Sequence, residues 1–412
     1  MTLAQQALGQ TDPPKEWIDP DTGHKVIRLS TEPGSQSLYF HENAYSLDGQ
    51  KLVFTIPPQR RGAEVPDAPA TIYSVNLKTR QVERVAQGRI LQAGRKTNEV
   101  FYTRDGVVYA ADLNSFQERE VVKIPEGRQV RCINCDEALL AGTLDATDPT
   151  GATTRPATRP ILPQTQRMFP GRTDLTPEER ASAAKEDNLS RRLANAGSQA
   201  LFTLNIATGE MKTFGYAYAW LNHLQFSPTD PSLLMFCHEG TWHEVDRIWT
   251  VRTDGSDLQL RHKREMDMEI AGHEFWGHDG KWIWYDLQTP RSQVFWIAGL
   301  NIETGERRRY HLERDWWSIH FNVSHDGKMF CGDGGDPGQV AFAKDGQWIN
   351  LFRVQPDGTL SREKLVNMSK QNYGRNPGLL EPNVTFTPDD KWIVFRSNMF
   401  GPSQVLAVAV DK

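Results

Sequence analysis

The sequence predicts an all-β fold: a seven-bladed β-propeller that is closed by an N-terminal strand and carries a partly helical insertion. Two repeated patterns predict it. A polar turn, often x-Asp-Gly-Lys, precedes a short apolar strand, and this pair recurs seven times along the 412 residues. Each copy is followed by a second strand segment with a turn such as Thr-Gly-Glu or Asp-Gly-Thr. Units that repeat at roughly 40–60 residues and cannot bury both faces alone are typical of blades stacked around an axis.

The two patterns locate the blades in chain order. The turn-and-strand copies are YSLDGQKLVFT (45–55), AGRKTNEVFYT (93–103), CINCDEALLAGT (132–143), FSPTDPSLLMFCHE (226–239), WGHDGKWIWYDL (276–287), VSHDGKMFCGDG (323–334) and FTPDDKWIVFRS (386–397). The second segments are IYSVNLKTRQVERV, VYAADLNSFQEREV, LFTLNIATGEMKTF, IWTVRTDGSDLQL, WIAGLNIETGERRRY, LFRVQPDGTL and VLAVAV. The Asp-Gly and Thr-Gly turns supply the positive φ angles of tight hairpins, and alternating apolar residues supply the packed faces.

The last blade ends at its third strand, VLAVAV (405–410). The segment HKVIRLS (24–30) follows the turn DPDTG and is predicted to be the fourth strand of that blade, which closes the ring. Closure also removes the exposed edges of an open sheet. The predicted organisation is an N-terminal extension over residues 1–23 and a single propeller domain over residues 24–412.

Residues 144–198 interrupt the repeat and are rich in proline, threonine and charge. Within them, Thr176 followed by Pro177 and Glu179 is a helix start, and the helix is predicted to run to about Ala194. We therefore expect an insertion between blade strands, over one face of the disc. Two interpretations stay open: a solvated excursion, or a lid or wall beside the active face.

Composition excludes several classes of partner. The net charge is −5 and the chain has no long basic run, so we expect no nucleic acid partner. No apolar stretch approaches the ~20 residues of a membrane span, so we expect no membrane partner. The start, MTLAQQALGQTDPPKEW, lacks the features of a signal peptide but resembles the region around a cleavage site. Cytoplasm and periplasm both stay open, and we expect a monomer or a homodimer.

Four cysteines are present. Cys132 and Cys135 have CxxC spacing, but the two further ligands that zinc needs are not seen, and a redox motif would need a helix start here. Together with Cys237 and Cys331 they are predicted to be buried free thiols.

Polar residues beside the innermost strands are the candidates for a site, because propellers bind ligands at the mouth of the central channel. These residues are His41, Glu42, His223, His238, Glu239, Asp246, Arg247, His273, His320, Glu381 and Asn383. His223, His273, His320 and the Glu381/Asn383 pair each lie a few residues before the turn of their blade. Equivalent positions of different blades converge on one axis, so the sequence predicts an axial site.

Two kinds of chemistry suit these side chains. Histidine, glutamate and asparagine side chains in this set offer the imidazole, carboxylate and amide ligands of a divalent metal such as Mn²⁺ or Ca²⁺. A further histidine beside an arginine suits proton abstraction next to a carboxylate, because arginine can pair that carboxylate with two hydrogen bonds. Together they describe β-elimination from a uronic acid, with an oligosaccharide as the expected partner.

Three segments, WLNHLQFSPTDPSLLMFCHEGTWHEVDRIW, GHEFWGHDGKWIWYDL and HFNVSHDGKMFCGDGG, resemble the oligogalacturonate lyases, which are seven-bladed propellers that split short pectin fragments. The N-terminal DPDTGHKVIRLS and the final FTPDDKWIVFRSN are similar too. The resemblance spans most of the chain outside residues 144–198. It implies that His273 is the base for the C5 proton, that Arg247 pairs the substrate carboxylate, and that His320 is a ligand of Mn²⁺.

The chain departs from the pattern of that family at two places. Where the family has a His-Pro-His motif, this chain has Glu381-Pro382-Asn383, and Gly378 replaces a nearby glutamine ligand. A His-Glu-Asn set would accept Ca²⁺ or Mg²⁺ as well as Mn²⁺, or bind no metal and contact sugar hydroxyls instead. Gln36-Ser37-Leu38-Tyr39 replaces a His-Arg-Asn-Tyr run, so a glucuronate-containing or rhamnose-linked substrate stays open.

Further residues are assigned by position. His223, His238, Glu239, His41 and Trp317 are expected to contact substrate, with Trp316 or Trp317 as a sugar platform. His262, His278 and His311 are expected at the surface. Two other function classes stay open: a non-catalytic TolB-like propeller that binds sugar or protein, and a hydrolase that uses Glu381 with a second carboxylate. Elimination alone creates an unsaturated uronate that absorbs ultraviolet light.

Overall fold

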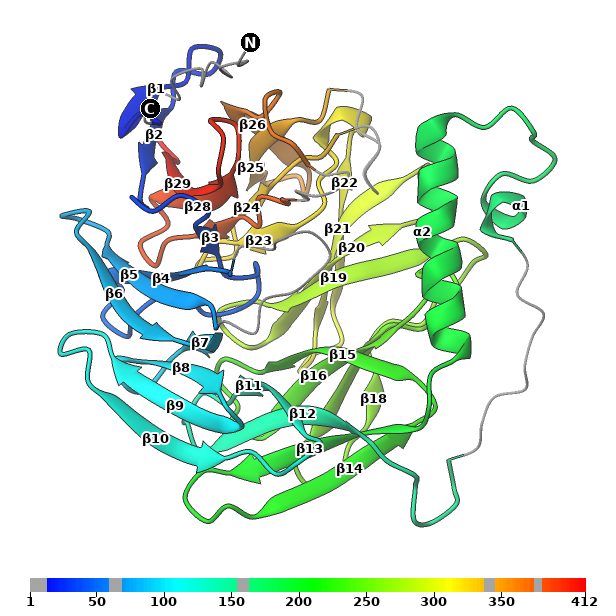
Figure 1. Cartoon of the computed structure of the whole chain (residues 1–412). Coiled ribbons are helices and arrows are strands. Elements are labelled where there is room, and N and C mark those ends of the chain that lie inside the picture. Colours follow the sequence, from blue (N-terminus) through cyan, green and yellow to red (C-terminus); the bar gives the residue numbers. More distant parts are fainter. Residues whose placement is uncertain (1–12, 59–68, 154–162, 337–344, 374–379) are drawn as a thin grey trace, which may run out of the picture.

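A computed structural model of the chain describes residues 13–58, 69–153, 163–336, 345–373 and 380–412 (Figure 1). Their strands form seven antiparallel sheets, six with four strands and one with five. The sheets are the predicted seven blades, and each contains one copy of both repeated patterns. No helix among these residues is long and apolar enough to cross a membrane.

The first six blades follow the chain without crossovers between them. The first three contain β3 (Gln36–Ser37), β4 (Lys51–Ile56), β5 (Thr71–Asn76), β6 (Val82–Gln87); β7 (Arg89–Ala93), β8 (Glu99–Arg104), β9 (Val107–Asp112), β10 (Glu118–Lys123); and β11 (Gln129–Ile133), β12 (Leu139–Asp145), β13 (Gln199–Asn205), β14 (Met211–Ala217). The next three contain β15 (Trp220–Phe226), β16 (Leu233–Glu239), β17 (Ile248–Arg252), β18 (Gln259–Leu260); β19 (Ile270–Trp276), β20 (Trp282–Gln288), β21 (Phe295–Asn301), β22 (Arg307–Leu312); and β23 (Phe321–Val323), β24 (Met329–Gly332), β25 (Trp348–Val354), β26 (Leu360–Asn367).

The seventh blade joins the two ends of the chain. It contains β27 (Thr385–Phe386), β28 (Trp392–Ser397) and β29 (Gln404–Ala409), and β2 (Lys25–Arg28) pairs with β29 as predicted. β1 (Glu16–Ile18), within the expected N-terminal extension, adds a fifth strand beside β2. The ring is therefore closed by hydrogen bonds between the first and last strands of the chain.

The core lies between neighbouring blades. Val26, Ile349, Leu365 and Ile393 are buried in one such layer, between the sixth and seventh blades. Burial of apolar surface at about 25 cal/mol per Å² is the main term that holds blade to blade. All four cysteines are free; three are buried as predicted, and Cys135 is half-buried.

The insertion leaves the third blade at the turn between β12 and β13, whose register runs to Asp145 opposite Gln199. It contains a short helix, α1 (Gln164–Met168), and a long one, α2 (Pro177–Ala194). Thr176 and Glu179 form the predicted capping box at the start of α2. In Figure 1, α2 stands at the right-hand side, next to the ends of β19 and β20.

The first blade has an irregular inner strand. Ser37 pairs with Phe54 and Tyr45 with Leu52, so Leu38–Ala44 lies opposite a single residue of β4. The extra residues leave the sheet and enter the channel. We call Leu38–Ala44 the axial segment.

Candidate active site

An equivalent position, within the inner strand or shortly before it, carries a polar residue in four successive blades: His223, His273, His320 and Asn383. His223, His273 and Asn383 have left-handed backbone conformations, with φ of 49°, 46° and 55°. β15 and β19 also shift register at their histidines. Such bulges re-aim a side chain, and a non-glycine residue at positive φ costs about 1–3 kcal/mol. The strained backbone therefore occurs where these side chains come together, at one end of the propeller axis.

His273 is held by a carboxylate through one ring nitrogen. Its Nδ1 lies 2.8 Å from Oδ1 of Asp286, and no described residue hydrogen-bonds its Nε2. Burial above all, with His320 and Arg247, lowers the pKa of His273 well below its ordinary value. Burial raises the pKa of Asp286 to about 7. The imidazole is therefore neutral. Above about pH 7, where Asp286 is ionised, Nδ1 is the donor to Asp286 and the Nε2 lone pair is available for a proton.

His320 has the same arrangement in the next blade. Its Nδ1 lies 2.8 Å from Oδ2 of Asp333, and both His–Asp pairs are separated by 13 residues in the chain. Its Nε2 lies 3.7 Å from Oε2 of Glu381 and 3.3 Å from the Tyr39 hydroxyl. A histidine whose Nδ1 is fixed by a carboxylate is typical of metal ligands.

Arg247 is buried between two carboxylates. Its Nε donates to Oε2 of Glu274 at 2.9 Å, and its Nη1 donates to Oε1 of Glu239 at 2.6 Å. The other oxygen of Glu239 lies 3.5 Å from Nε2 of His223. Although burial opposes it, Arg247 holds the pKa of Glu239 well below its usual range. Among the described residues Nη2 has no partner, so this part of the guanidinium can meet a ligand carboxylate.

Aromatic rings enclose His273. The Trp242 ring meets it edge-on with centroids 4.9 Å apart, and lies 5.4 Å from Cζ of Arg247. Phe40, from the axial segment, lies 6.2 Å from His273 and 4.8 Å from His320. The two imidazoles are themselves 4.7 Å apart. These apolar surroundings exclude water and strengthen electrostatic interactions at the site.

The predicted metal ligands His320, Glu381 and Asn383 lie together. Besides the contact of Glu381 with His320, the side-chain amide of Asn383 donates to the Glu381 carbonyl at 3.1 Å. Oδ1 of Asn383 is buried without a partner among the described residues. A bound cation would satisfy that oxygen, and the imidazole, carboxylate and amide together suit Mn²⁺, Ca²⁺ or Mg²⁺. These residues fit a divalent ion. Gly378, the remaining position of the family's set, lies outside the described residues.

A second group of potential ligands comprises His223, Cys237 and Glu239, with one atom of each within 4.8 Å of the others. Glu239 is already paired with Arg247. Burial raises the pKa of the Cys237 thiol well above its ordinary value, which disfavours the thiolate that metals bind. A cation here would also face the guanidinium charge, so the His320 group is the better candidate.

The predicted substrate-contacting residues divide into two sets. His223 and Glu239 join the cluster described above, and the ring of His41 lies 5.8 Å from that of His223. His238 does not join them, because neighbouring residues of a strand point to opposite faces. Its ring stacks on Trp249 at 4.9 Å instead.

Trp317 is a core residue and the prediction that it forms a sugar platform is wrong. It is 1 % exposed, its Nε1 donates to the Leu312 carbonyl at 3.2 Å, and its ring packs on Phe295. Two adjacent tryptophans give no indication of which ring faces the core, and here the second does.

Of the three histidines expected at the surface, only His311 is exposed. His262 is buried, and its Nε2 lies 2.7 Å from Oε1 of Glu269. His278 is half-buried and its ring stacks on that of His325 at 3.8 Å. In both cases a specific polar or aromatic partner from another segment covers the ring.

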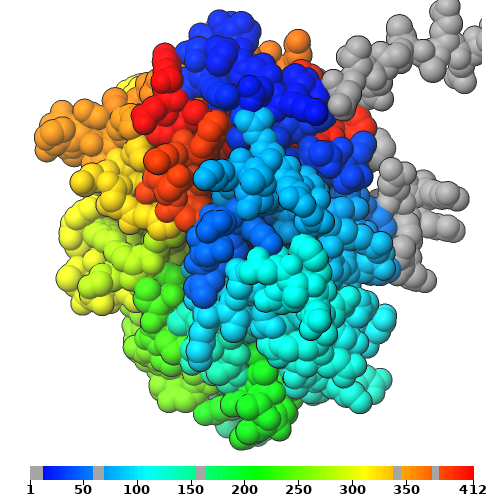
Figure 2. All heavy atoms as spheres, turned by 90° about the vertical axis from the view of Figure 1, so that its left-hand side faces the viewer, coloured from blue at the N-terminus to red at the C-terminus, as the bar shows by residue number. Residues whose placement is uncertain are grey.

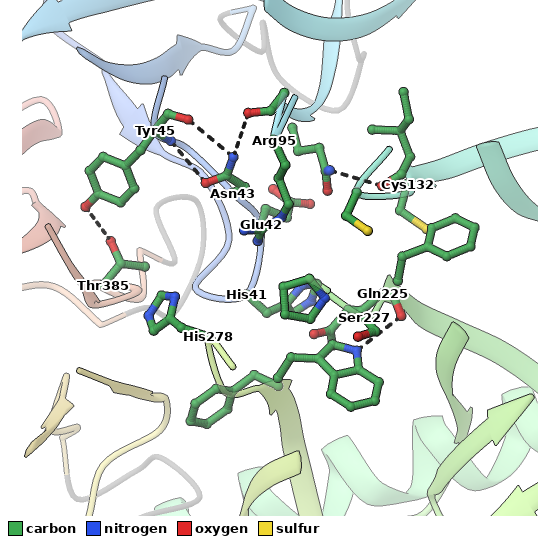
Figure 3. Close-up of a pocket in the computed structure, with 18 of the residues that line it drawn as sticks. His41, Glu42, Asn43, Tyr45, Arg95, Cys132, Gln225, Ser227, His278 and Thr385 are labelled. Carbon is green, nitrogen blue, oxygen red and sulfur yellow. Dashed lines mark hydrogen bonds between the residues drawn. The ribbon is translucent and has the colours of Figure 1, made fainter. Parts of the chain in front are cut away.

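The opposite end of the channel holds a separate cavity of about 360 Å³. Figure 2 shows the molecule from that side, with the blades following one another around the disc in the order of the colours. In Figure 3, His41, Gln225 and His278 surround this cavity, and the Asn43 amide donates to the carbonyls of Tyr45 and Ala93. Phe40 and His41 line the cavity and also contact the imidazole cluster. The axial segment therefore separates the two ends of the channel.

The sequence interpretation missed Asp286, Asp333, Glu274 and Trp242. A signal for the first two was present: each aspartate follows its histidine by the same separation, in HEFWGHDGKWIWYD and HFNVSHDGKMFCGD. Glu274 is adjacent to His273 and could be taken for a strand residue facing away. Trp242 gave no signal, because its loop is positioned by contacts with the distant α2.

Comparisons with known proteins identify a family and similar chains. The sequence model of a family described as oligogalacturonate lyase matches residues 193–412. An oligogalacturonate lyase of Dickeya dadantii is 26% identical over 417 aligned residues, and the match covers 95% of each chain. An oligogalacturonide lyase of Pectobacterium atrosepticum is 25% identical with the same coverage.

Solved structures show the same fold. An oligogalacturonate lyase in complex with manganese superposes with a TM-score of 0.72 at 23% identity, and 96% of each chain is covered. An oligogalacturonate lyase from Vibrio parahaemolyticus gives a TM-score of 0.73 at the same identity and coverage. The propeller fold is thus shared over nearly the whole length of these chains.

Proposed function

This chain belongs to the oligogalacturonate lyase family, and on that premise we propose that it cleaves short galacturonate-containing oligosaccharides by β-elimination at the His273 site. Membership makes it a carbon–oxygen lyase. The observation that carries the proposal is the unpaired Nε2 of a neutral His273, beside the buried guanidinium of Arg247. A base and a carboxylate-binding group at one place are what elimination from a uronate requires.

In the proposed reaction, Nε2 of His273 removes the proton from C5 of the uronate. The electrons of that C–H bond form the C4–C5 double bond, the bond from C4 to its glycosidic oxygen breaks, and the departing oxygen takes up a proton. Asp286 keeps Nδ1 protonated and stabilises the imidazolium that forms. Nη2 of Arg247 pairs the substrate carboxylate, which makes the neighbouring C5–H more acidic.

A divalent ion held by His320, Glu381 and Asn383 would supply further positive charge to neutralise the same carboxylate. Asp333 supports this arrangement in two ways. It fixes the ring of His320, and it accepts the backbone N–H of Asn383 at 3.2 Å. The protein thus holds two of the three donors, His320 and Asn383, in place through one buried carboxylate.

The residues that differ from the family pattern meet at one arginine. Arg396 donates from Nε to the Glu381 carbonyl at 2.8 Å, and from Nη1 to Oε1 of Gln36 and the Ser37 carbonyl, both at 3.3 Å. Changes at both places therefore alter the same wall of the site. This observation supports a second candidate within the same reaction: a glucuronate-containing or rhamnose-linked uronate as the preferred substrate.

Ultraviolet absorbance of the unsaturated product tests the proposal. The purified protein is mixed with digalacturonate, trigalacturonate and glucuronate- or rhamnose-linked oligosaccharides, with and without a chelator. We expect the absorbance to rise, and His273→Ala to lower the rate by ~10²–10⁴-fold, the usual contribution of a general base. His238→Ala is the matched control, because His238 faces away from the cluster, and it should retain the rate of the unsubstituted protein.

Three results would contradict the proposal. Equal losses in the two histidine variants would show that the effect of His273 is structural. New reducing ends without absorbance would indicate a hydrolase. Binding of the oligosaccharides without any product would indicate a sugar receptor.

A further inference from the structure

We propose that α2 and the start of β15 form an outer binding subsite for a third uronate of the substrate, with Arg192 pairing its carboxylate and Trp220 contacting its sugar ring. This subsite rests on the proposed function, because it extends the substrate beyond the two residues that share the cleaved bond. It gives the insertion a role as one wall of the substrate site.

An open groove of about 560 Å³ lies between the last turns of α2 and the third and fourth blades. Its lining combines one aromatic residue with amides and guanidiniums: Asn188, Arg191, Arg192, Asn195, Ala196, Gln199 and Trp220. Aromatic faces and convergent polar side chains are the groups that bind a pyranose ring and its substituents. The composition therefore suits a sugar rather than an apolar ligand.

No acidic side chain among the described residues neutralises the arginines of this groove. Cζ of Arg192 lies 3.6 Å from the centre of the Trp220 ring, and no described carboxylate pairs with it. Arg191 donates only to the side-chain oxygen of Asn188, at 2.5 Å. Lys185, two turns before Arg192, lies 5.5 Å from the Trp242 ring and also has no acidic partner among the described residues. The free positive charge favours an anionic ligand.

The acidic residues of α2 cannot supply that charge, because those whose side chains are described are used elsewhere. Glu186 pairs with Arg291 at 2.8 Å, on the side of the helix that faces the fifth blade. Asp187 accepts the backbone N–H of Gln164 at 2.9 Å. The helix thus turns its paired acids toward the protein and leaves its cations on the groove side.

The groove is next to the catalytic cluster. Trp220 pairs in register with Glu239, the residue that holds Arg247. A side chain at Gly240, directly after Glu239, would come within 2.7 Å of Leu193, so α2 rests on the end of that strand. Lys185 and Arg192 are seven residues apart on one face of the helix, about 10 Å along its axis. Cations therefore extend from Trp242, beside His273, outward to Trp220.

Steady-state kinetics with digalacturonate and trigalacturonate test the subsite, and the uncharged probe is trigalacturonate that is methyl-esterified only at the residue that the subsite would bind. We expect Arg192→Gln and Trp220→Ala to raise KM for trigalacturonate about tenfold, the effect of losing one charge-assisted contact, with kcat unchanged. KM for digalacturonate should stay within about twofold, and the ester should not distinguish Arg192→Gln from the unsubstituted protein. Arg180→Gln is the matched control: it removes an exposed cation of α2 that does not line the groove.

An equal rise of KM for both oligomers, or none for trigalacturonate, would overturn the subsite. Calorimetric binding of trigalacturonate to His273→Ala, alone and combined with Arg192→Gln, separates this result from a failure of the proposed function. If the protein forms no absorbing product, the proposed function fails. The subsite is then tested by binding alone: it is supported if Arg192→Gln weakens binding about tenfold, and contradicted if binding is unchanged.

Discussion

His273 and His320 share one local arrangement, in which an aspartate of the same blade holds the imidazole ring. Both rings are fixed through Nδ1 by an aspartate at the end of the second strand of their own blade, and both are buried. The second nitrogen of His273 faces the enclosed base position, whereas that of His320 faces Glu381. Under the proposed function, the same kind of pair orients a proton acceptor in one blade and a metal ligand in the next.

Asp286→Asn should slow elimination by about 10²-fold or more with the fold intact. An asparagine can donate to Nδ1, which favours the tautomer that carries its proton on Nε2 and so blocks the base. The measurement is kcat from product absorbance, with circular dichroism as the test of folding. Asp390→Asn is the control, because Asp390 pairs with Nδ1 of His325 at 2.8 Å on the other side of the molecule. A similar loss in both variants would contradict an orienting role for Asp286.

Glu381→Gln should weaken Mn²⁺ binding about 10–100-fold, because an amide replaces the only carboxylate among the three proposed ligands. Calorimetric titration of the metal-free protein with Mn²⁺ measures this without reference to activity. Cys237→Ser should leave the affinity unchanged. If Cys237→Ser weakens binding and Glu381→Gln does not, the ion belongs to the group formed by His223, Cys237 and Glu239.

At the scale of the element, α2 separates what the sequence could predict from what it could not. Thr176 and Glu179 predicted where the helix begins, because a capping box is a local pattern. Nothing local predicted that Glu186 would reach Arg291 or that the N–H of Trp242 would lie 3.4 Å from Glu186. Only these distant contacts decide whether the insertion extends into solvent or packs beside the site. The contacts of Glu186 place α2 against the loops that carry Trp242 and Arg291.

Glu186→Ala should lower the free energy of unfolding by about 3–5 kcal/mol, because it leaves the guanidinium of Arg291 buried without its carboxylate. Urea unfolding measures the loss, and proteolysis within residues 144–198 should become faster. Arg172→Ala breaks the exposed pair with Glu179 and should cost less than about 1 kcal/mol. Equal effects of the two substitutions would show that α2 is not anchored through Glu186.

At the scale of the whole molecule, repetition made the fold predictable. Seven copies of one short pattern point to the same blade, so a weak signal in one copy, such as CINCDEALLAGT, is supported by the others. The site was predictable only to the level of position. Equivalent positions in different blades identified His223, His273 and His320. Which of two adjacent tryptophans is buried depends on packing between blades, and Trp317 was therefore assigned wrongly.

Val26→Asp should destabilise the closed ring by several kcal/mol, because it places a charge between the sixth and seventh blades, where Val26 is fully buried. The unpaired edge of β29 would then be free to pair with other chains, so aggregation should appear in size-exclusion chromatography. Lys25→Asp, one residue earlier on the opposite face of β2, breaks only an exposed pair with Glu16. It should leave the thermal midpoint within a few degrees; a large loss would contradict closure through the buried face.

The axial segment blocks the channel between its two ends. Phe40 packs against His320, and His41 lies beside His223, so Leu38–Ala44 lies on the axis next to the imidazoles. Under the proposed function, a polymer could therefore not thread through the ring, and substrate would enter and both fragments would leave at the same end of the channel. Such a dead end would favour cleavage near chain ends over cleavage within a long chain.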